Sequence, residues 1–269
     1  MLPKTLILML SIVMSLPLFA ASPAEKVIDA SIQAAGGRQA FESLGVLKME
    51  ISQSETEADG SRHTGTVTAY VDTTLSNSRL EMPNNIVVTR NGNTGWATID
   101  GTLDDRKQTP RMAPGTCRQK LFPLLLPFSL KIEGTGFSKP SQTTYQGQKM
   151  SKIGMTVAGL FFQSPLISTH WDLLFPTDTT QSPIARYLPL DQFIKVHPEG
   201  MQVEIKEKSK VGGVLLPTKV IFRGVDASGK TTSHTREIKI KYSIVQDPDR
   251  GLFISPETLE KLDEGGPVR

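Results

Sequence analysis

Apolar and polar residues alternate with a period of two along much of the chain. The alternation is clearest in residues 47–52 (LKMEIS) and 66–72 (TVTAYVD), where every second side chain is apolar. This pattern is typical of antiparallel strands with one face buried and the other in water. The sequence EADGSR between them contains an Asp-Gly pair, which predicts a hairpin.

The same alternation returns in later segments, and no long linker divides the chain. Strands are expected within residues 78–82, 85–90, 95–100, 151–161, 169–178, 183–188, 201–209, 216–225 and 234–245. Val27, Ile28, Ile32 and Ala35 recur at helical spacing before Gly36, so a helix precedes the first strand. A second short helical turn is expected around Phe41. The chain from residue 22 to 269 is therefore predicted to be a single, mainly β domain with few helices.

One stretch breaks the alternation. Residues 120–130, KLFPLLLPFSL, are almost wholly apolar, and Pro123 and Pro127 disfavour both a regular helix and a central strand. We expect a short, kinked, helical insertion, here called the plug, that is covered on both sides. It either fills a curled sheet as ordinary core or closes an apolar cavity whose contents can exchange.

The N-terminus has the layout of an export signal. Lys4 precedes an apolar run of about 15 residues that is followed by AASPA, the order of regions found in a secretory signal peptide. The run is shorter than the roughly 20 apolar residues of a membrane-spanning helix. We expect residues 1–21 to be a cleaved signal peptide, and no cysteine follows the run that would carry a lipid anchor at this position.

Charge and reactive residues narrow the function classes. The formal charge of +3 is close to neutral and evenly spread, which argues against nucleic acid. Cys117 is the only cysteine, so an intrachain disulfide is impossible, and the four histidines form no metal-binding motif. His170 and Asp172 share one face of a strand, which leaves hydrolysis as a minor alternative, but no nucleophile motif accompanies them. We expect no enzyme activity, no cofactor and no metal site.

Four segments carry a family resemblance, and together they span most of the chain. They are AAGGRQAFESLGVLKMEI (residues 34–51), NIVVTRNGNTGWATIDG (85–101, with Trp96), VGGVLLPTKVIF (211–222) and the closing GLFISPE (251–257). In this order they resemble the LolA/LolB-like superfamily of periplasmic lipoprotein carriers, that is, outer membrane lipoprotein-sorting proteins. The Arg-Pro pair of those carriers is absent, since Thr73–Thr74 stand at the aligned positions, so another lipid cargo fits as well as a lipoprotein.

The resemblance implies an incompletely closed antiparallel β barrel, a half-barrel sheet, with a few short helices as a plug or lid. It also implies a soluble periplasmic carrier of lipid or lipoprotein acyl chains, with an inner- or outer-membrane protein as partner. The expected ligand-binding residues of the apolar cavity and lid are Leu121, Phe122, Leu125, Phe128, Leu130, Val67, Val71 and Met155. The alternative is a non-enzymatic envelope sensor or protein-interaction domain on the same fold, with the cavity collapsed into core.

Overall fold

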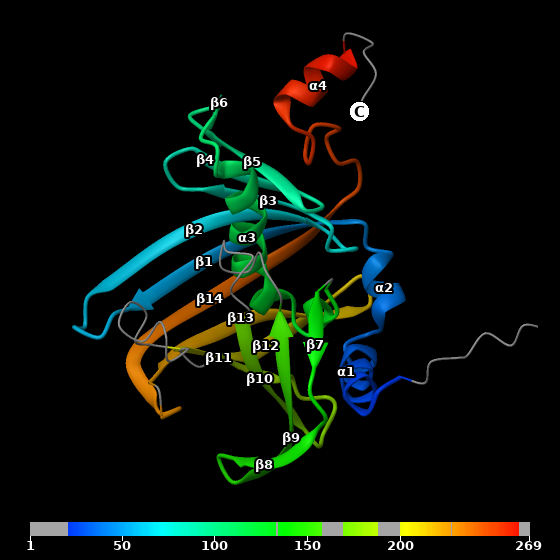
Figure 1. The fold of residues 1–269 in the computed structure, drawn as a ribbon, viewed down its shortest axis with the longest axis vertical. Helices are drawn as coiled ribbons and strands as arrows, with labels where there is room; N and C mark the ends of the chain where they lie inside the picture. Colours follow the sequence, from blue (N-terminus) through cyan, green and yellow to red (C-terminus); the bar gives the residue numbers. More distant parts are fainter. Residues whose placement is uncertain (1–20, 133, 158–168, 188–199, 227, 264–269) are drawn as a thin grey trace, which may run out of the picture.

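The computed structural model describes residues 21–132, 134–157, 169–187, 200–226 and 228–263. The expected signal peptide, residues 1–21, lies almost wholly outside the described residues. The described chain is mainly β, as predicted. It forms one 14-stranded sheet in which every pairing is antiparallel (Figure 1).

The sheet follows chain order except at its centre. Its order is β6-β5-β4-β3-β2-β1-β14-β13-β12-β11-β10-β9-β7, with β8 paired to β9 off this path. The strands are β1 (Val46–Thr56), β2 (Arg62–Asp72), β3 (Asn77–Met82), β4 (Ile86–Asn91), β5 (Thr94–Ile99), β6 (Thr102–Leu103), β7 (Thr135–Phe137), β8 (Ser141–Tyr145), β9 (Gln148–Val157), β10 (Thr169–Pro176), β11 (Ile184–Tyr187), β12 (Gly200–Val211), β13 (Val214–Val225) and β14 (Thr231–Val245).

The sheet is open, which confirms the predicted half-barrel. Its end strands, β6 and β7, are not paired with each other among the described residues. Because the first and last long strands, β1 and β14, pair along their whole length from Val46↔Val245 to Thr56↔Thr235, the middle of the sheet is continuous. The predicted hairpin between β1 and β2 is present, and Gly60 in its turn has φ +87°.

Four α-helices and two 3-10 helices complete the described fold. They are α1 (Pro23–Ala34), α2 (Arg38–Glu42), α3 (Thr109–Leu121), η1 (Phe122–Leu125), η2 (Phe128–Leu130) and α4 (Pro256–Asp263). Ser22 caps α1 in a reciprocal arrangement with Glu25, which satisfies two otherwise orphan amides. Of the described helices, none has the length and apolar character needed to cross a membrane.

Helix α3 was not expected from the sequence, and it positions the plug. It contacts β3, β4 and β5 on the face of the sheet that carries the core. Gly95 on β5 allows this close approach, because a Cβ there would lie 2.4 Å from the Thr89 carbonyl oxygen and 2.9 Å from Ala113 Cβ. The plug leaves the C-terminus of α3 directly and lies beneath it against the sheet (Figure 1).

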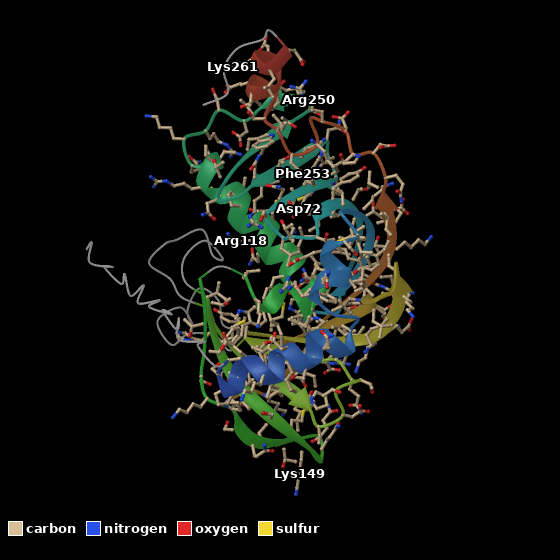
Figure 2. All side chains as sticks on the ribbon, turned by 90° about the vertical axis from the view of Figure 1, so that its right-hand side faces the viewer. Asp72, Arg118, Lys149, Arg250, Phe253 and Lys261 are labelled. Atoms are coloured by element: carbon tan, nitrogen blue, oxygen red, sulfur yellow. The ribbon has the colours of Figure 1, made fainter. Side chains whose placement is uncertain are left out.

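Helix α4 lies at one end of the molecule. Figure 2 places Lys261 of α4 and Lys149 of β9 at opposite ends. No residue of α4 is buried, and Asn91 Nδ2 donates a hydrogen bond of 3.0 Å to the Phe253 carbonyl just before it. The C-terminal segment is therefore tied to the β4–β5 turn and adds nothing to the central core.

Candidate functional site

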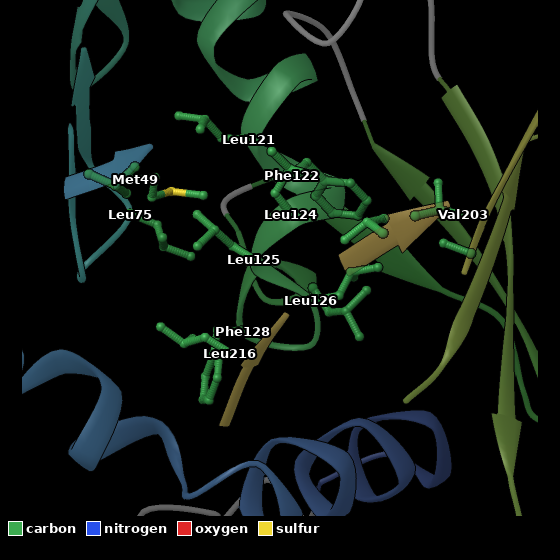
Figure 3. Close-up of a cluster of buried hydrophobic side chains, with 14 of the residues drawn as sticks. Met49, Leu75, Leu121, Phe122, Leu124, Leu125, Leu126, Phe128, Val203 and Leu216 are labelled. Atoms are coloured by element: carbon green, nitrogen blue, oxygen red, sulfur yellow. The ribbon is translucent and has the colours of Figure 1, made fainter. Parts of the chain in front are cut away.

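The plug fills the concave face of the sheet, meaning the face that carries the main apolar core. Residues 121–130 are all buried. The two prolines divide the segment as predicted: Pro123 lies in η1, and Pro127 follows the extended residue Leu126 and precedes η2. Figure 3 shows Leu124, Leu125 and Leu126 pointing in different directions from this kinked backbone, so that the plug contacts the core on several sides.

All eight predicted ligand-binding residues lie in or against this one core. The exposed fraction of Phe128 and Leu130 is 0%, and that of Leu125 is 2%. Val71 on β2 and Met155 on β9 belong to the same buried cluster, and Val67 is half-buried at its border. The structure thus brings the predicted residues together, although it shows them packed against one another.

Aromatic contacts hold the plug at both ends. The rings of Phe41 on α2 and Phe128 are stacked, with centroids 4.2 Å apart and an interplanar angle of 6°. Near the plug's start, Phe122 contacts Trp171 on β10 with centroids 5.6 Å apart. Pairs of this kind stabilise by about 0.5–1.5 kcal/mol beyond the area that they bury.

Three polar side chains satisfy carbonyl groups of the plug. Arg38 Nη2 donates to the Phe128 carbonyl at 2.7 Å, Ser129 Oγ to the Phe122 carbonyl at 2.6 Å, and Tyr242 OH to the Leu124 carbonyl at 3.4 Å. Burial lowers the pKa of Arg38 and raises the pKa of Tyr242. The plug is therefore docked by specific hydrogen bonds as well as by apolar contacts, which the sequence pattern did not reveal.

Among the described residues, a small cavity lies beside the plug. It has a volume of about 30 Å³ and is lined by Val71, Leu121, Phe122 and Leu125, together with Cys117. This volume suits about two water molecules, whereas pockets for small-molecule ligands measure about 300–1,000 Å³. An acyl chain therefore fits in this cavity only if the plug moves.

Cys117 is a structural thiol in this arrangement. Its side chain is fully buried on α3, and burial raises its pKa to about 11. Since the thiolate is the reactive species, such a cysteine is inert at neutral pH. In this position Cys117 acts as a small hydrophobic residue of the core.

The surroundings of His170 and Asp172 do not support the minor alternative of hydrolysis. Because Trp171 between them is buried, His170 and Asp172 lie on the opposite, outer face of β10. Asp172 forms an ion pair of 2.7 Å with Lys152, and His170 Nδ1 lies 3.3 Å from Thr156 Oγ1. The imidazole and the carboxylate are thus each engaged with another residue.

A cluster that the sequence did not indicate lies at the far end of the concave face. His234 Nε2 on β14 is 2.9 Å from Glu55 Oε1 and 3.9 Å from Glu57 Oε2. The three groups lie close enough to hold a metal ion in principle. They come from opposite ends of the sequence, so motif spacing could not reveal them.

Comparison with solved structures identifies the fold. The chain is similar to a LolA superfamily protein from Nitrosomonas europaea, with 10% identity, a TM-score of 0.56, and 86% of this chain and 98% of that chain covered. It is also similar to a putative outer membrane lipoprotein-sorting protein domain from Vibrio parahaemolyticus (8% identity, TM-score 0.53, 86% and 97% covered). A DUF1329 family protein from Desulfovibrio piger matches with 10% identity, a TM-score of 0.51, and 87% and 98% covered.

Neither a scan against protein-family models nor a search of curated proteins finds a match to the sequence. At identities of 8–10%, the structural likeness concerns the fold alone. This chain has the LolA-like fold.

Proposed function

We propose that this protein is a soluble periplasmic carrier that binds the acyl chains of a lipid or lipoprotein on the concave face of its sheet, without catalysis. The observation that carries the proposal is the plug, an apolar segment that fills the concave face of an open sheet. Two solved proteins with this fold are described as a LolA superfamily protein and as a lipoprotein-sorting domain. Export by a signal peptide at residues 1–21 and a single domain from residue 22 onward are part of the proposal.

The chemistry of the concave face suits an acyl chain. An acyl chain offers only apolar area, and its burial contributes about 25 cal/mol per Å² without any acid, base or metal. The plug and the cargo present the same kind of surface to the same residues, so they compete for one site. In this proposal the structure shows the plug in its docked position.

The backbone of the plug suits such an exchange. Its helical turns, η1 and η2, span only 4 and 3 residues, so few backbone hydrogen bonds within the segment would break if the plug changed its conformation. Its carbonyl groups are satisfied instead by Arg38 and Tyr242 on neighbouring elements and by Ser129. The plug can therefore leave the core without unwinding a long helix.

The alternative of a protein-interaction domain that uses a sheet edge has less support. The edge strands β6, β7 and β8 span 2, 3 and 5 residues, so each offers only a short segment to a partner strand. A membrane protein that delivers or accepts the cargo remains part of the carrier proposal.

The proposed function is tested by native mass spectrometry of the protein purified from a membrane-bearing host, with organic extraction of bound molecules. We expect co-purifying acyl lipids that added monooleoylglycerol displaces. A cargo-free mass, together with no binding of monooleoylglycerol, would contradict the proposal and make the plug permanent core.

A further inference from the structure

The concave face changes from apolar to polar within one step of the register on three neighbouring strands. Residues directly opposite each other on antiparallel strands share a face, so the register identifies which side chains point inward. On the half next to the plug, the inward residues of β1, β14 and β2 are apolar. They are Leu47, Met49, Ile51, Ile238, Ile240, Tyr242, Val67, Ala69 and Val71.

Beyond Ile51 the inward apolar side chains end on β1 and β2, and they end one pair later on β14, where Ile238 lies opposite Gln53. Gln53 follows on β1 and lies against Gly65 on β2, whose Cβ would be 3.4 Å from Gln53 Nε2. Arg236 follows Ile238 on β14 and is paired in register with Glu55. In Figure 1 the three strands run on together past α3 toward their far hairpin ends. A ligand lying along them would meet apolar groups at one end and polar groups at the other.

Two cations lie at this boundary. The Arg236 guanidinium stacks over the ring of Phe222, 4.4 Å from its centroid, and its Nε atom is buried without a hydrogen-bond partner. Lys120, the first residue of the plug, lies just before η1, and η1 contacts β13, the strand that carries Phe222. Desolvation and then the positive charge of Arg236 lower the pKa of Lys120. Desolvation lowers the pKa of Arg236 as well.

Neither cation forms an ion pair within the parts of the chain that the structure describes. The charge of Glu55 acts on both, but Glu55 Oε1 lies 2.9 Å from His234 Nε2. Lys120 is nevertheless exposed to solvent, so a ligand can reach it. Two cations in partly desolvated surroundings, neither in an ion pair among the described residues, favour an anionic ligand group, and they disfavour a divalent metal ion at Glu55 and His234.

We propose that Lys120 and Arg236 bind the anionic head group, a carboxylate or a phosphate, of an acyl cargo whose tail lies on the apolar half of the concave face. This inference rests on the proposed function, because it assigns an orientation to the same cargo. Lys120 also belongs to the plug, so head-group binding and movement of the plug involve the same segment.

The test compares three ligands with the same oleoyl chain: neutral monooleoylglycerol, oleate and oleoyl-lysophosphatidate. Their affinities are measured by native mass spectrometry below the micellar concentration. Since a hydrogen bond to a charged group contributes more than a neutral one, we expect the unaltered protein to bind at least one anionic ligand about tenfold more tightly than monooleoylglycerol. The tighter of the two anions distinguishes a phosphate head group from a carboxylate.

Variants assign the preference to the two cations. Arg236→Gln and Lys120→Gln should each weaken binding of the preferred anion about tenfold and leave binding of monooleoylglycerol unchanged. The matched control is Lys239→Gln, which removes the same charge from the outer face of β14, where Lys239 pairs with Glu237. It should change neither affinity. Because Lys120 is exposed, Lys120→Gln keeps the test valid if Arg236→Gln fails to fold.

Two results would overturn the head-group site. If monooleoylglycerol binds but the anions bind no better, or keep their preference in both variants, the head-group site is wrong and the carrier proposal stands. If the unaltered protein does not bind monooleoylglycerol at all, the carrier proposal itself fails, and the head-group site fails with it.

Discussion

Replacing Phe128 with alanine should lower the free energy of unfolding by about 3–5 kcal/mol, the range for large aromatic side chains removed from a core. Phe128 is 0% exposed, and its ring stacks on Phe41 at 4.2 Å, so the substitution removes apolar contacts and leaves a void between α2 and the plug. The measurement is urea-induced unfolding followed by circular dichroism.

The matched control is Phe253→Ala. Phe253 is half-buried in the C-terminal segment, away from the plug. Its replacement should lower the free energy of unfolding by less than about 1.5 kcal/mol. Equal losses in the two variants would show that the plug is not docked in solution as the structure has it.

Replacing Arg38 with methionine should destabilise the protein and yet tighten binding of an acyl ligand. Arg38 donates to the Phe128 carbonyl at 2.7 Å, and a hydrogen bond from a charged group contributes about 1.5–3 kcal/mol. Methionine keeps an apolar stem but not the bond, so the plug leaves its docked position more often. A larger binding-competent fraction raises the apparent affinity in proportion, and we expect about a tenfold gain for monooleoylglycerol.

Lower stability combined with tighter ligand binding is expected if the plug is a movable lid, and not if it is permanent core. Arg62→Met is the control, because Arg62 is exposed on β2 and donates only to Ser54. It should alter neither stability nor affinity appreciably. An Arg38→Met protein that is less stable but binds monooleoylglycerol no better than the unaltered protein would mean that the plug does not move for the ligand.

The long central strands could be predicted from sequence because their burial is one-sided. In β1, Met49 and Ile51 are buried while Glu50 between them is exposed, and β14 repeats this contrast at Ile238 and Lys239. This alternation is the direct consequence of a sheet with one face on the core. Helices α1 and α2 were predictable because two glycines mark the boundary between them. Gly36 and Gly37 have positive φ values of 114° and 89°, which glycine adopts readily.

Elements without such a contrast were missed. Helix α3 contains Pro114 and Gly115 in its interior, which sequence rules treat as helix breakers, and its packing against β5 outweighs their low propensity. Strands β6 and β7 are too short to show a period. Helix α4 buries no residue, so no apolar stripe marks it strongly.

The candidate site was predictable in composition but not in arrangement. The near absence of polar residues in the plug predicted the burial of residues 121–130. Its hydrogen bonds to Arg38 and Tyr242, and the proximity of Lys120 to Arg236, depend on the tertiary fold because these residues are far apart in the sequence. The sequence therefore suggested an apolar cargo, whereas only the structure suggested how its head group would be oriented.

The central claim is that the plug and an acyl chain exclude each other from the concave face. Hydrogen–deuterium exchange of residues 121–130, with and without saturating monooleoylglycerol, tests this most directly. We predict that bound ligand makes the plug amides exchange faster while the amides of β1, β2 and β14 stay protected. Ligand binding with unchanged or slower exchange in the plug would contradict the claim and place the ligand elsewhere on the protein.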